Sequence, residues 1–228
     1  MIAERLQAVR DRIAAACARS GRPPSEVTLV GVSKTHPAEL VREAFAAGLR
    51  DFGENRVQEA EGKADALAEL RAAGLRWHLV GHLQANKAKK AAAVFDVLHS
   101  VDDAVLGGRL DRASAEAGRV LPVLVQVDLA GEATKFGLQE SSLLATLESL
   151  RALSAIRVEG LMVLPPYSDD PQATRPYFER LRGLRDLGVT RGLCGPQLSM
   201  GMSHDFEVAI EEGATLVRVG TAIFGQRG

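Results

Sequence analysis

The sequence predicts an α/β protein built as a (β/α)8 TIM barrel with one additional helix at its N-terminus. From Val27 onward, short apolar runs alternate with longer Ala- and Leu-rich runs of helical periodicity, the pattern of parallel βαβ units. Eight such units in about 200 residues fit the lower size limit of a barrel. The main rival is an open doubly wound sheet, which favours a G-x-G-x-x-G turn after its first strand. The turn here is SKTHP, which favours the barrel.

Residues 1–22 predict an amphipathic helix that precedes the barrel and packs on it. Apolar side chains recur there at helical spacing, with charged residues between them, at Ile2, Leu6, Val9 and Ile13. Acidic residues in the same stretch argue against a signal or transit peptide. No Pro-, Gly- or Ser-rich linker divides the remaining chain, so we expect residues 1–228 to form a single domain.

The first predicted strand is apolar almost throughout, as expected of a barrel strand, because helices cover one of its faces and the packed interior covers the other. The eight predicted strands are Val27–Ser33, Leu49–Gly53, Arg76–Val80, Asp96–Ser100, Pro122–Val127, Arg157–Val163, Gln197–Met200 and Thr215–Val219. The predicted helices between them are Ala38–Ala47, Asn55–Ala73, Leu83–Ala93, Asp103–Ala117, Glu140–Leu153, Pro171–Leu187 and Ser203–Glu212.

Composition excludes several classes of protein. The net charge is −1, from 28 basic and 29 acidic residues, so no overall field favours nucleic acid or an anionic membrane. Apolar residues make up 46% of the chain, yet no apolar run is long enough to span a membrane. Cys17 and Cys194 lie far apart in the sequence, and we predict that both are free thiols in a reducing compartment. We therefore predict a cytoplasmic protein.

Polar residues follow nearly every predicted strand, at the end of the barrel where active sites lie. In chain order these residues include Lys34, His36, Glu54, Asn55, His82, Ser100, Asp102, Asp128, Tyr167, Ser199 and Thr221. Lys34, directly after the first strand, has two explanations. It can simply extend its ammonium group to water. Alternatively, partial desolvation at the barrel mouth can lower the pKa of such a lysine and free its amine to attack an aldehyde.

Arg218 lies in the last predicted strand, whose two faces are both covered. A covered arginine is either paired with a carboxylate, such as Glu54 or Asp128, or bound to a ligand. Gly220 and Thr221 follow, where backbone N–H groups and a hydroxyl can donate to an anion. Phosphate sites of TIM barrels lie after strands seven and eight, which makes this stretch a predicted phosphate cradle.

The loop after the seventh strand, SMGMSH, adds Ser199, Gly201 and Ser203 to this region. Ser203 can equally be the N-cap of the helix that follows. A lysine amine, an arginine and a phosphate cradle together fit a phosphorylated aldehyde. Pyridoxal 5′-phosphate (PLP) is the leading candidate, and the phosphorylated sugar of a Schiff-base aldolase is the rival.

Over nearly its whole length the chain resembles the PLP homeostasis proteins, often called the YggS/PROSC family. Six motifs carry the resemblance in the family's order: VGVSKTHP, DFGENRVQE, WHLVGHLQANK, GLMVLPP, LSMGMSHDFEVAIEEG and VRVGTAIFG. The resemblance implies a fold-type III PLP-binding barrel, like the N-terminal domain of alanine racemase. It also implies intracellular PLP homeostasis or carriage, with PLP-dependent apo-enzymes as possible recipients.

The same resemblance assigns the site. The predicted cofactor-binding residues are Lys34, Asn55, Ser199, Met200, Ser203, Arg218, Gly220 and Thr221. Lys34 matches the lysine that forms the internal aldimine, and Arg218 matches the residue that faces the pyridine nitrogen. Ser199, Gly220 and Thr221 match the phosphate-binding region. Asn55 matches a position near the cofactor, whereas Met200 and Ser203 are expected neighbours, and no metal ligand is predicted.

An arginine at the pyridine nitrogen only donates hydrogen bonds, so the ring stays unprotonated and is a poorer electron sink. This argues against transamination but not against racemisation, which needs acid/base groups on both faces of a substrate. The sequence offers only Tyr167, Tyr177 and His82 for that role. We therefore predict a PLP carrier or homeostasis protein without clear turnover. The alternative is a PLP-dependent amino-acid racemase or other weak PLP enzyme.

A third hypothesis is a module that binds nucleic acid or protein. Its sequence support is confined to Lys87, Lys89 and Lys90, which we expect to form a solvated helix face. We expect no nucleic-acid or membrane partner, a monomer, and no role for the two cysteines.

Overall fold

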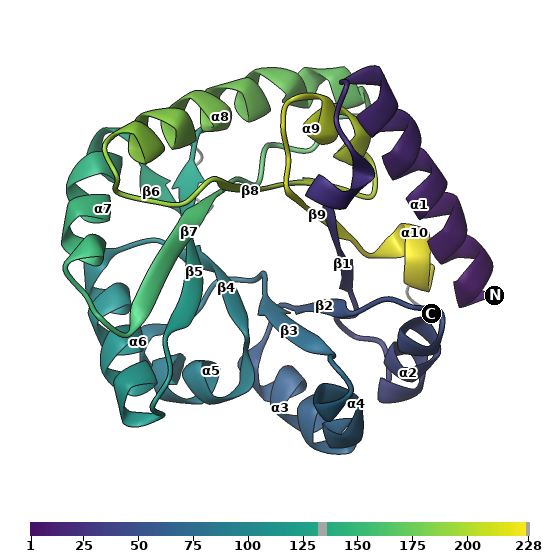
Figure 1. Ribbon diagram of the computed structural model, residues 1–228, viewed down its shortest axis with the longest axis horizontal. Helices are drawn as coiled ribbons and strands as arrows, with labels where there is room; N and C mark the ends of the chain where they lie inside the picture. The colour runs from purple at the N-terminus through teal and green to yellow at the C-terminus, as the bar shows by residue number, and fades with distance from the viewer. Residues whose placement is uncertain (132–135, 227–228) are drawn as a thin grey trace.

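The computed structural model describes residues 1–131 and 136–226, and its strands form a ring surrounded by helices (Figure 1). The strands are β1 (Thr28–Val32), β2 (Asp51–Glu54), β3 (Arg76–Leu79), β4 (Val97–Val101), β5 (Leu121–Asp128), β6 (Leu138–Gln139), β7 (Ile156–Met162), β8 (Gln197–Met202) and β9 (Leu216–Val219). They are parallel and pair in the order β4-β3-β2-β1-β9-β8-β7-β5-β6. Because β4 also pairs with β5, eight strands close a ring, and β6 adds to β5 beside it. The predicted TIM barrel is confirmed.

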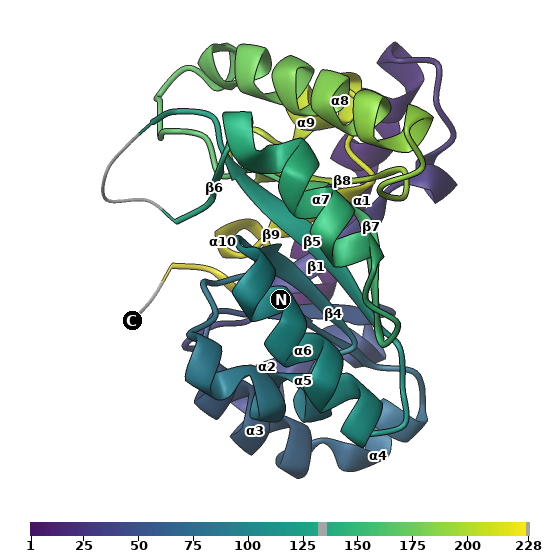
Figure 2. The same cartoon turned by 90° about the vertical axis from the view of Figure 1, so that its left-hand side faces the viewer.

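Helices cover the outside of the ring, as the view turned by 90° also shows (Figure 2). They are α1 (Ile2–Arg19), α2 (Ala38–Ala46), α3 (Val57–Ala66), α4 (Ala68–Ala72), α5 (Ala88–Val94), α6 (Ala104–Glu116), α7 (Leu143–Arg151), α8 (Arg175–Thr190), α9 (Phe206–Glu211) and α10 (Thr221–Phe224). Short 3-10 turns occur at Pro24–Glu26, Ala85–Lys87, Glu140–Ser142 and Pro171–Thr174. Within the described residues, no helix is both long and apolar enough to cross a membrane.

Five predicted helices differ from the observed ones. The helices expected from Leu83, Glu140 and Pro171 are preceded by 3-10 turns and begin only at Ala88, Leu143 and Arg175. The single helix expected over Asn55–Ala73 is broken at Leu67, whose φ of −126° and ψ of 27° separate α3 from α4. Leu67 is buried, so the break lets its side chain reach the core. The helix expected from Ser203 begins only at Phe206. The two-residue β6 was not predicted, because so short a strand carries no readable period.

Two groups of apolar side chains pack on opposite faces of the strands. A small cluster joins Val30, Leu124, Met162 and Leu216. Since β1 and β5 are not neighbours in the ring, these contacts pass through the barrel interior. The larger cluster includes Phe52, Trp77 and Phe206 and fills the space between strands and helices. Both faces of each strand are therefore covered, which explains the continuous apolar runs.

Helix α1 packs against α2, α9 and α10, so the N-terminal segment covers the outside of the barrel (Figure 1). Its buried residues are the predicted apolar stripe, with Ala16 and Cys17 extending it. Arg12 donates two hydrogen bonds to Glu207 at 3.0 and 2.8 Å, and Arg19 donates to Glu211 at 2.8 Å. Apolar packing and ion pairs thus join α1 to α9.

We expect the free energy of unfolding to fall as the pH is lowered from about 7 to about 3. Hydrogen bonds from Arg12 and Arg175 hold the pKa of Glu207 and of Glu211 below the ordinary value. A carboxylate with a lowered folded-state pKa stabilises the fold above its unfolded pKa, and this contribution is lost as the pH falls through the folded pKa. Both pairs are partly exposed, so each contributes less than about 1 kcal/mol. Urea unfolding at several pH values measures the slope. Glu207→Gln should flatten it, and an unchanged slope would contradict this account.

Candidate functional site

The predicted lysine and the predicted phosphate cradle lie side by side at the barrel mouth. Lys34 follows β1 and Gly220 follows β9, and these two strands pair with Gly31 opposite Val219. A Cβ atom placed on Gly220 would lie 3.3 Å from the carbonyl oxygen of Val32. The carboxyl ends of the strands, and α10 after β9, are on the same side of the barrel as β6 (Figure 2).

Glu54, Glu59 and Lys63 form a cluster of ion pairs around the turn that carries Lys34, and we call this cluster the bracket. Ser33 Oγ donates to Glu54 Oε1 at 2.7 Å, and Lys63 Nζ donates to the same oxygen at 2.7 Å and to the Ser33 carbonyl at 2.8 Å. Lys63 also pairs with Glu59 at 2.8 Å, and Glu59 Oε1 accepts from the Thr35 N–H at 2.5 Å. The backbone is therefore held on both sides of Lys34, which itself is half-buried.

The two carboxyl groups of this bracket differ in electrostatics. Burial raises the pKa of Glu54, although the hydrogen bonds from Lys63 and Ser33 act against it. Burial also acts to raise the pKa of Glu59, but the hydrogen bonds from Lys63 and the Thr35 N–H outweigh it and lower that pKa. Glu54 Oε2 is buried without a hydrogen-bond partner among the described residues. The bracket thus depends on one oxygen of Glu54 and on Lys63.

Thr35 has a φ of 65°, the one positive value at a non-glycine residue in the described part of the chain. A β-branched residue in this region is strained by roughly 1–2 kcal/mol. The hydrogen bond from its N–H to Glu59 holds the strained conformation. The strain lies next to Lys34, where it fixes the direction of the turn.

Thr35→Gly should raise the free energy of unfolding by about 0.5–1 kcal/mol, because glycine adopts this φ without strain. Urea unfolding measures the change. Thr35→Ala is the matched control, since it removes the branch but keeps a Cβ, and it should fall between wild type and Thr35→Gly. A glycine variant less stable than wild type would show that contacts of the Thr35 side chain outweigh its strain.

Arg218 crosses the barrel interior and is almost completely buried. It donates to Ser199 Oγ at 2.6 Å and to the Val163 carbonyl at 2.9 Å. Burial lowers the pKa of Arg218 to about 10, and the charge of Asp205 partly offsets this. The guanidinium is therefore charged at neutral pH, and three of its five N–H groups have no recorded acceptor in the described residues.

The carboxylate partner considered for Arg218 is not found. Glu54 is bound by Lys63, and Asp128 Oδ1 accepts from the N–H groups of Ala130 and Gly131 at 3.0 Å. Within residues 1–131 and 136–226, no carboxylate lies within ion-pair distance of Arg218. The salt-bridge explanation with Glu54 or Asp128 is therefore wrong, and a ligand remains as the second explanation.

Ser203 is part of the loop that faces Gly220, and the N-cap explanation for it is wrong. The N-cap of α9 is Asp205, whose carboxylate accepts from the Met202 N–H at 2.7 Å. Ser203 Oγ instead accepts from the N–H groups of Gly220 at 3.2 Å and Ala222 at 3.5 Å. Hydroxyl and amide donors from two strand ends thus converge where the sequence predicts a phosphate.

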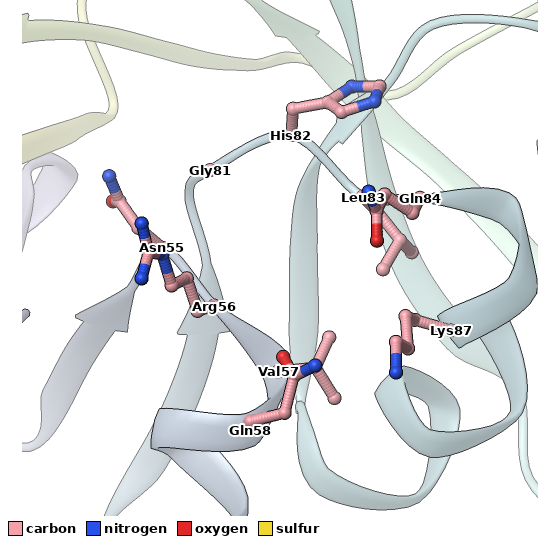
Figure 3. Close-up of a pocket in the computed structure, with 9 residues that line it drawn as sticks. All are labelled: Asn55, Arg56, Val57, Gln58, Gly81, His82, Leu83, Gln84 and Lys87. Carbon is pink, nitrogen blue, oxygen red and sulfur yellow. The ribbon is translucent and has the colours of Figure 1, made fainter.

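A pocket of about 530 Å³ opens beside Asn55, at the carboxyl ends of β2 and β3 (Figure 3). It is lined by Asn55, Arg56, Val57, Gln58, Gly81, His82, Leu83, Gln84 and Lys87. A Cβ on Gly81 would lie 2.4 Å from the Asn55 carbonyl oxygen, so glycine is required for this close approach. Figure 3 shows Arg56 and Asn55 on one side and Lys87 on the other. Its charged lining residues are cations, which favours an anionic occupant.

The remaining predicted residues are placed in different ways. Ser199 faces the barrel interior, but the buried Met200 side chain belongs to the cluster between strands and helices. Met200 can therefore contribute only backbone groups to a ligand at the mouth. Tyr167 is exposed and donates to Asp169 at 3.1 Å. His82 stacks on Phe136 with ring centroids 3.6 Å apart, and its Nδ1 lies 3.3 Å from Asp102.

Several residues of the site were missed in the sequence. They are Glu59 and Lys63 of the bracket, and His78 and His99, which lie buried inside the barrel. Each histidine lies between apolar residues of a strand, which was a signal of burial in the sequence. Lys63 had none, because a lysine in a helical run reads as exposed.

Three comparisons place the chain among known proteins. Residues 5–228 match the family described as alanine racemase, N-terminal domain. Pyridoxal phosphate homeostasis proteins of Aquifex aeolicus and Pseudomonas aeruginosa are 45% identical over 225 residues and 46% identical over 226 residues. These alignments cover 98% and 99% of this chain and 97% and 96% of the relatives. The structure of PipY from Synechococcus elongatus with PLP bound is 44% identical, covers 99% of this chain and 100% of that chain, and superposes with a TM-score of 0.86.

Proposed function

Since this chain belongs to the family of pyridoxal phosphate homeostasis proteins, we propose that it binds PLP at the mouth of its barrel and acts in PLP homeostasis or carriage. The observation that carries the proposal is the buried Arg218, which has hydrogen-bond donors to spare and no carboxylate partner among the described residues. A buried guanidinium needs acceptors, and the ring nitrogen of PLP is one.

The other residues also fit the groups of this cofactor. The N–H groups of Gly220 and Ala222, which donate to Ser203 Oγ in this structure, would suit a phosphate together with the Thr221 hydroxyl if the phosphate took the place of the Ser203 oxygen as their acceptor. Lys34 stands in a turn fixed on both sides, beside this set. Amine, guanidinium and phosphate donors are thus arranged on β1, β8 and β9, three successive strands of the ring.

Each group has a separable task. PLP, when bound, supplies an aldehyde for amines and an electron-withdrawing ring. Lys34 provides the amine that attaches the cofactor, and Arg218 donates to the ring nitrogen without giving up its proton. Gly220, Thr221 and Ser203 hold the phosphate, with Ser199 holding Arg218. Asn55 lies at the end of β2 beside this region, where it can orient the cofactor ring.

Borohydride reduction tests the proposal. The protein is incubated with PLP, reduced, digested and mapped by mass spectrometry, with a sample lacking PLP as reference. We expect one pyridoxyl-phosphate adduct, on the peptide that contains Lys34. No adduct on any peptide would overturn the proposal, and an adduct confined to other lysines would overturn the assignment of the site.

The proposal extends to the cellular setting. We propose that the protein works in the cytoplasm as a monomer and that PLP-dependent apo-enzymes receive the cofactor from it. Support for delivery is that Lys34, which follows β1, and the pocket beside Asn55, at the ends of β2 and β3, both lie at the carboxyl end of the barrel strands. Mixing the PLP-loaded protein with an apo-aminotransferase should restore the activity of the latter, whereas failure of transfer would exclude carriage.

A second candidate function is weak PLP-dependent chemistry on amino acids, such as racemisation. The observation in its favour is the pair of His82 and Asp102 at the mouth, because it resembles a general base with its orienting carboxylate. Burial raises the pKa of Asp102, although the charge of His82 acts against it. Loss of α-deuterium from labelled amino acids tests this function, and the absence of exchange with every amino acid tried would exclude it.

A further inference from the structure

A continuous chain of buried hydrogen bonds runs through the barrel from Arg218 to Asp51. Arg218 donates to Ser199 Oγ at 2.6 Å, and Ser199 Oγ lies 2.7 Å from His99 Nδ1. His99 Nε2 lies 2.9 Å from His78 Nδ1, and His78 Nε2 lies 2.9 Å from Asp51 Oδ1. All five side chains are less than 9% exposed. This hydrogen-bond chain therefore links the mouth with the opposite end of the barrel, where β2 begins.

When both imidazoles are neutral, the residues at the two ends of the hydrogen-bond chain determine which atom donates and which accepts in every hydrogen bond. Arginine only donates, so Ser199 accepts from Arg218. An ionised Asp51 only accepts, so His78 carries its proton on Nε2 and offers Nδ1 as an acceptor. His99 must then donate from Nε2, and its Nδ1 accepts the hydroxyl hydrogen of Ser199. Each donor meets one acceptor, from the guanidinium to the carboxylate.

We infer that Asp51, His78 and His99 are positioning residues that act through Ser199 to hold Arg218 as a donor toward the cofactor. This inference rests on the proposed function. Because the hydroxyl hydrogen of Ser199 is committed to His99, a lone pair of Ser199 always faces Arg218. The guanidinium is thereby held by Ser199 and the Val163 carbonyl, and its remaining N–H groups are left to donate to the cofactor.

The charges along the chain agree with this direction. Burial would raise the pKa of Asp51, but the hydrogen bonds and charges of His78 and Arg76 outweigh it and lower that pKa. Burial, with the charges of His78 and Arg218, lowers the pKa of His99 well below the ordinary value. Asp51 is thus ionised and His99 neutral at neutral pH. The hydrogen-bond chain therefore connects the cation Arg218 with the anion Asp51.

The far end of the chain is separate from the cofactor site. Asp51 pairs with Arg76 at 2.8 Å and lines a pocket of about 450 Å³ together with Arg10 and Arg50. A substitution at Asp51 therefore changes no group at the barrel mouth. Any effect on cofactor binding must therefore be transmitted by the hydrogen-bond chain or result from a change in the stability of the whole fold. A control variant distinguishes these two causes.

The first test needs no cofactor. Nitrogen-15 NMR of the histidine rings at about pH 8, where imidazoles of ordinary pKa are neutral, reports which nitrogen carries the proton. We expect His78 and His99 both to be protonated on Nε2. A proton on Nδ1 of either ring would overturn the inference. In Asp51→Asn, whose amide can donate as well as accept, the reversed direction becomes possible, and His99 should show a mixture of both tautomers.

The second test compares Asp51→Asn with Asp96→Asn. Asp96 lies directly before β4, at the same end of the barrel, and pairs with Arg71 at 3.0 Å. It takes no part in the hydrogen-bond chain. We expect Asp51→Asn to weaken PLP binding on the order of fivefold and to shift the absorbance maximum of the bound cofactor. Asp96→Asn should change neither, although both variants can lower the melting temperature. Equal PLP affinity and spectrum in Asp51→Asn and wild type would overturn the inference, as would equal effects of both variants.

The wild-type protein separates this inference from the function on which it rests. If wild type binds no PLP, the proposed function fails and the inference fails with it. If wild type binds PLP and Asp51→Asn binds it identically, the inference alone fails.

Discussion

Lys34→Ala will abolish the borohydride-stable PLP adduct while leaving the protein folded. We propose Lys34 as the amine for the aldehyde, because its turn follows β1, and the end of β1 lies beside Gly220 at the end of β9. Lys34 is half-buried in a turn, so its truncation should cost no more than about 1 kcal/mol of stability. Peptide mapping after reduction measures the adduct, and urea unfolding measures the stability.

Lys87→Ala is the matched control, because Lys87 lies near the mouth, in the pocket beside Asn55 (Figure 3). It should retain the full adduct on Lys34. Noncovalent binding in Lys34→Ala should persist in weaker form, since Arg218 and the phosphate donors remain. An unchanged adduct in Lys34→Ala would show that another lysine carries the cofactor and would overturn the assignment.

Lys63→Met will lower the free energy of unfolding by about 3–5 kcal/mol, because it leaves a buried carboxylate without its cation. Lys63 and Glu54 form an ion pair at 2.7 Å, with side chains 9% and 0% exposed. After the substitution, only Ser33 donates to Glu54, whose second oxygen is already without a partner among the described residues. The Ser33 carbonyl also loses its donor, so the turn before Lys34 should loosen and PLP should bind more weakly.

Two further variants make this prediction specific. Lys90 pairs with Glu61 at 3.1 Å on the surface, and Lys90→Met should change stability by less than about 1 kcal/mol. Lys63→Met combined with Glu54→Gln should recover much of the loss, since no buried charge is then left unpaired. Equal effects of Lys63→Met and Lys90→Met on the free energy of urea unfolding would contradict the claim that the bracket stabilises the fold.

The barrel could be predicted because each strand carries its own signal. An apolar run such as Val27–Ser33, followed by a helical period, defines a βα unit without reference to the rest of the chain. The break at Leu67 could not be predicted, because it depends on how one buried side chain meets the core. The displaced start of α9 has a similar cause, since Ser203 bonds across to Gly220 instead of capping its own helix.

The candidate site divides in the same way. Lys34, Arg218 and Gly220 could be proposed from the sequence because the ends of parallel strands meet at the barrel mouth. The bracket of Glu54, Glu59 and Lys63 was missed, because its contacts join separate elements and a helical lysine carries no sign of burial. The hydrogen-bond chain through His78 and His99 was missed because it joins side chains of separate strands. Its direction follows from the chemistry of Arg218 and Asp51 at its two ends. Sequence therefore indicates which groups lie at the barrel mouth better than it indicates what holds them in place.

The pairing of β1 with β9 has a consequence for protein synthesis. Lys34 is made early and Arg218 and Gly220 are made late, and the ring closes only when β9 joins β1. At about 5–20 residues per second, the ribosome takes tens of seconds or less to reach β9. Throughout that interval the growing chain presents its lysine without the guanidinium or the phosphate donors. We therefore expect the cofactor to load only after β9 has been synthesised, so that a bound cofactor would mark a chain whose barrel has closed.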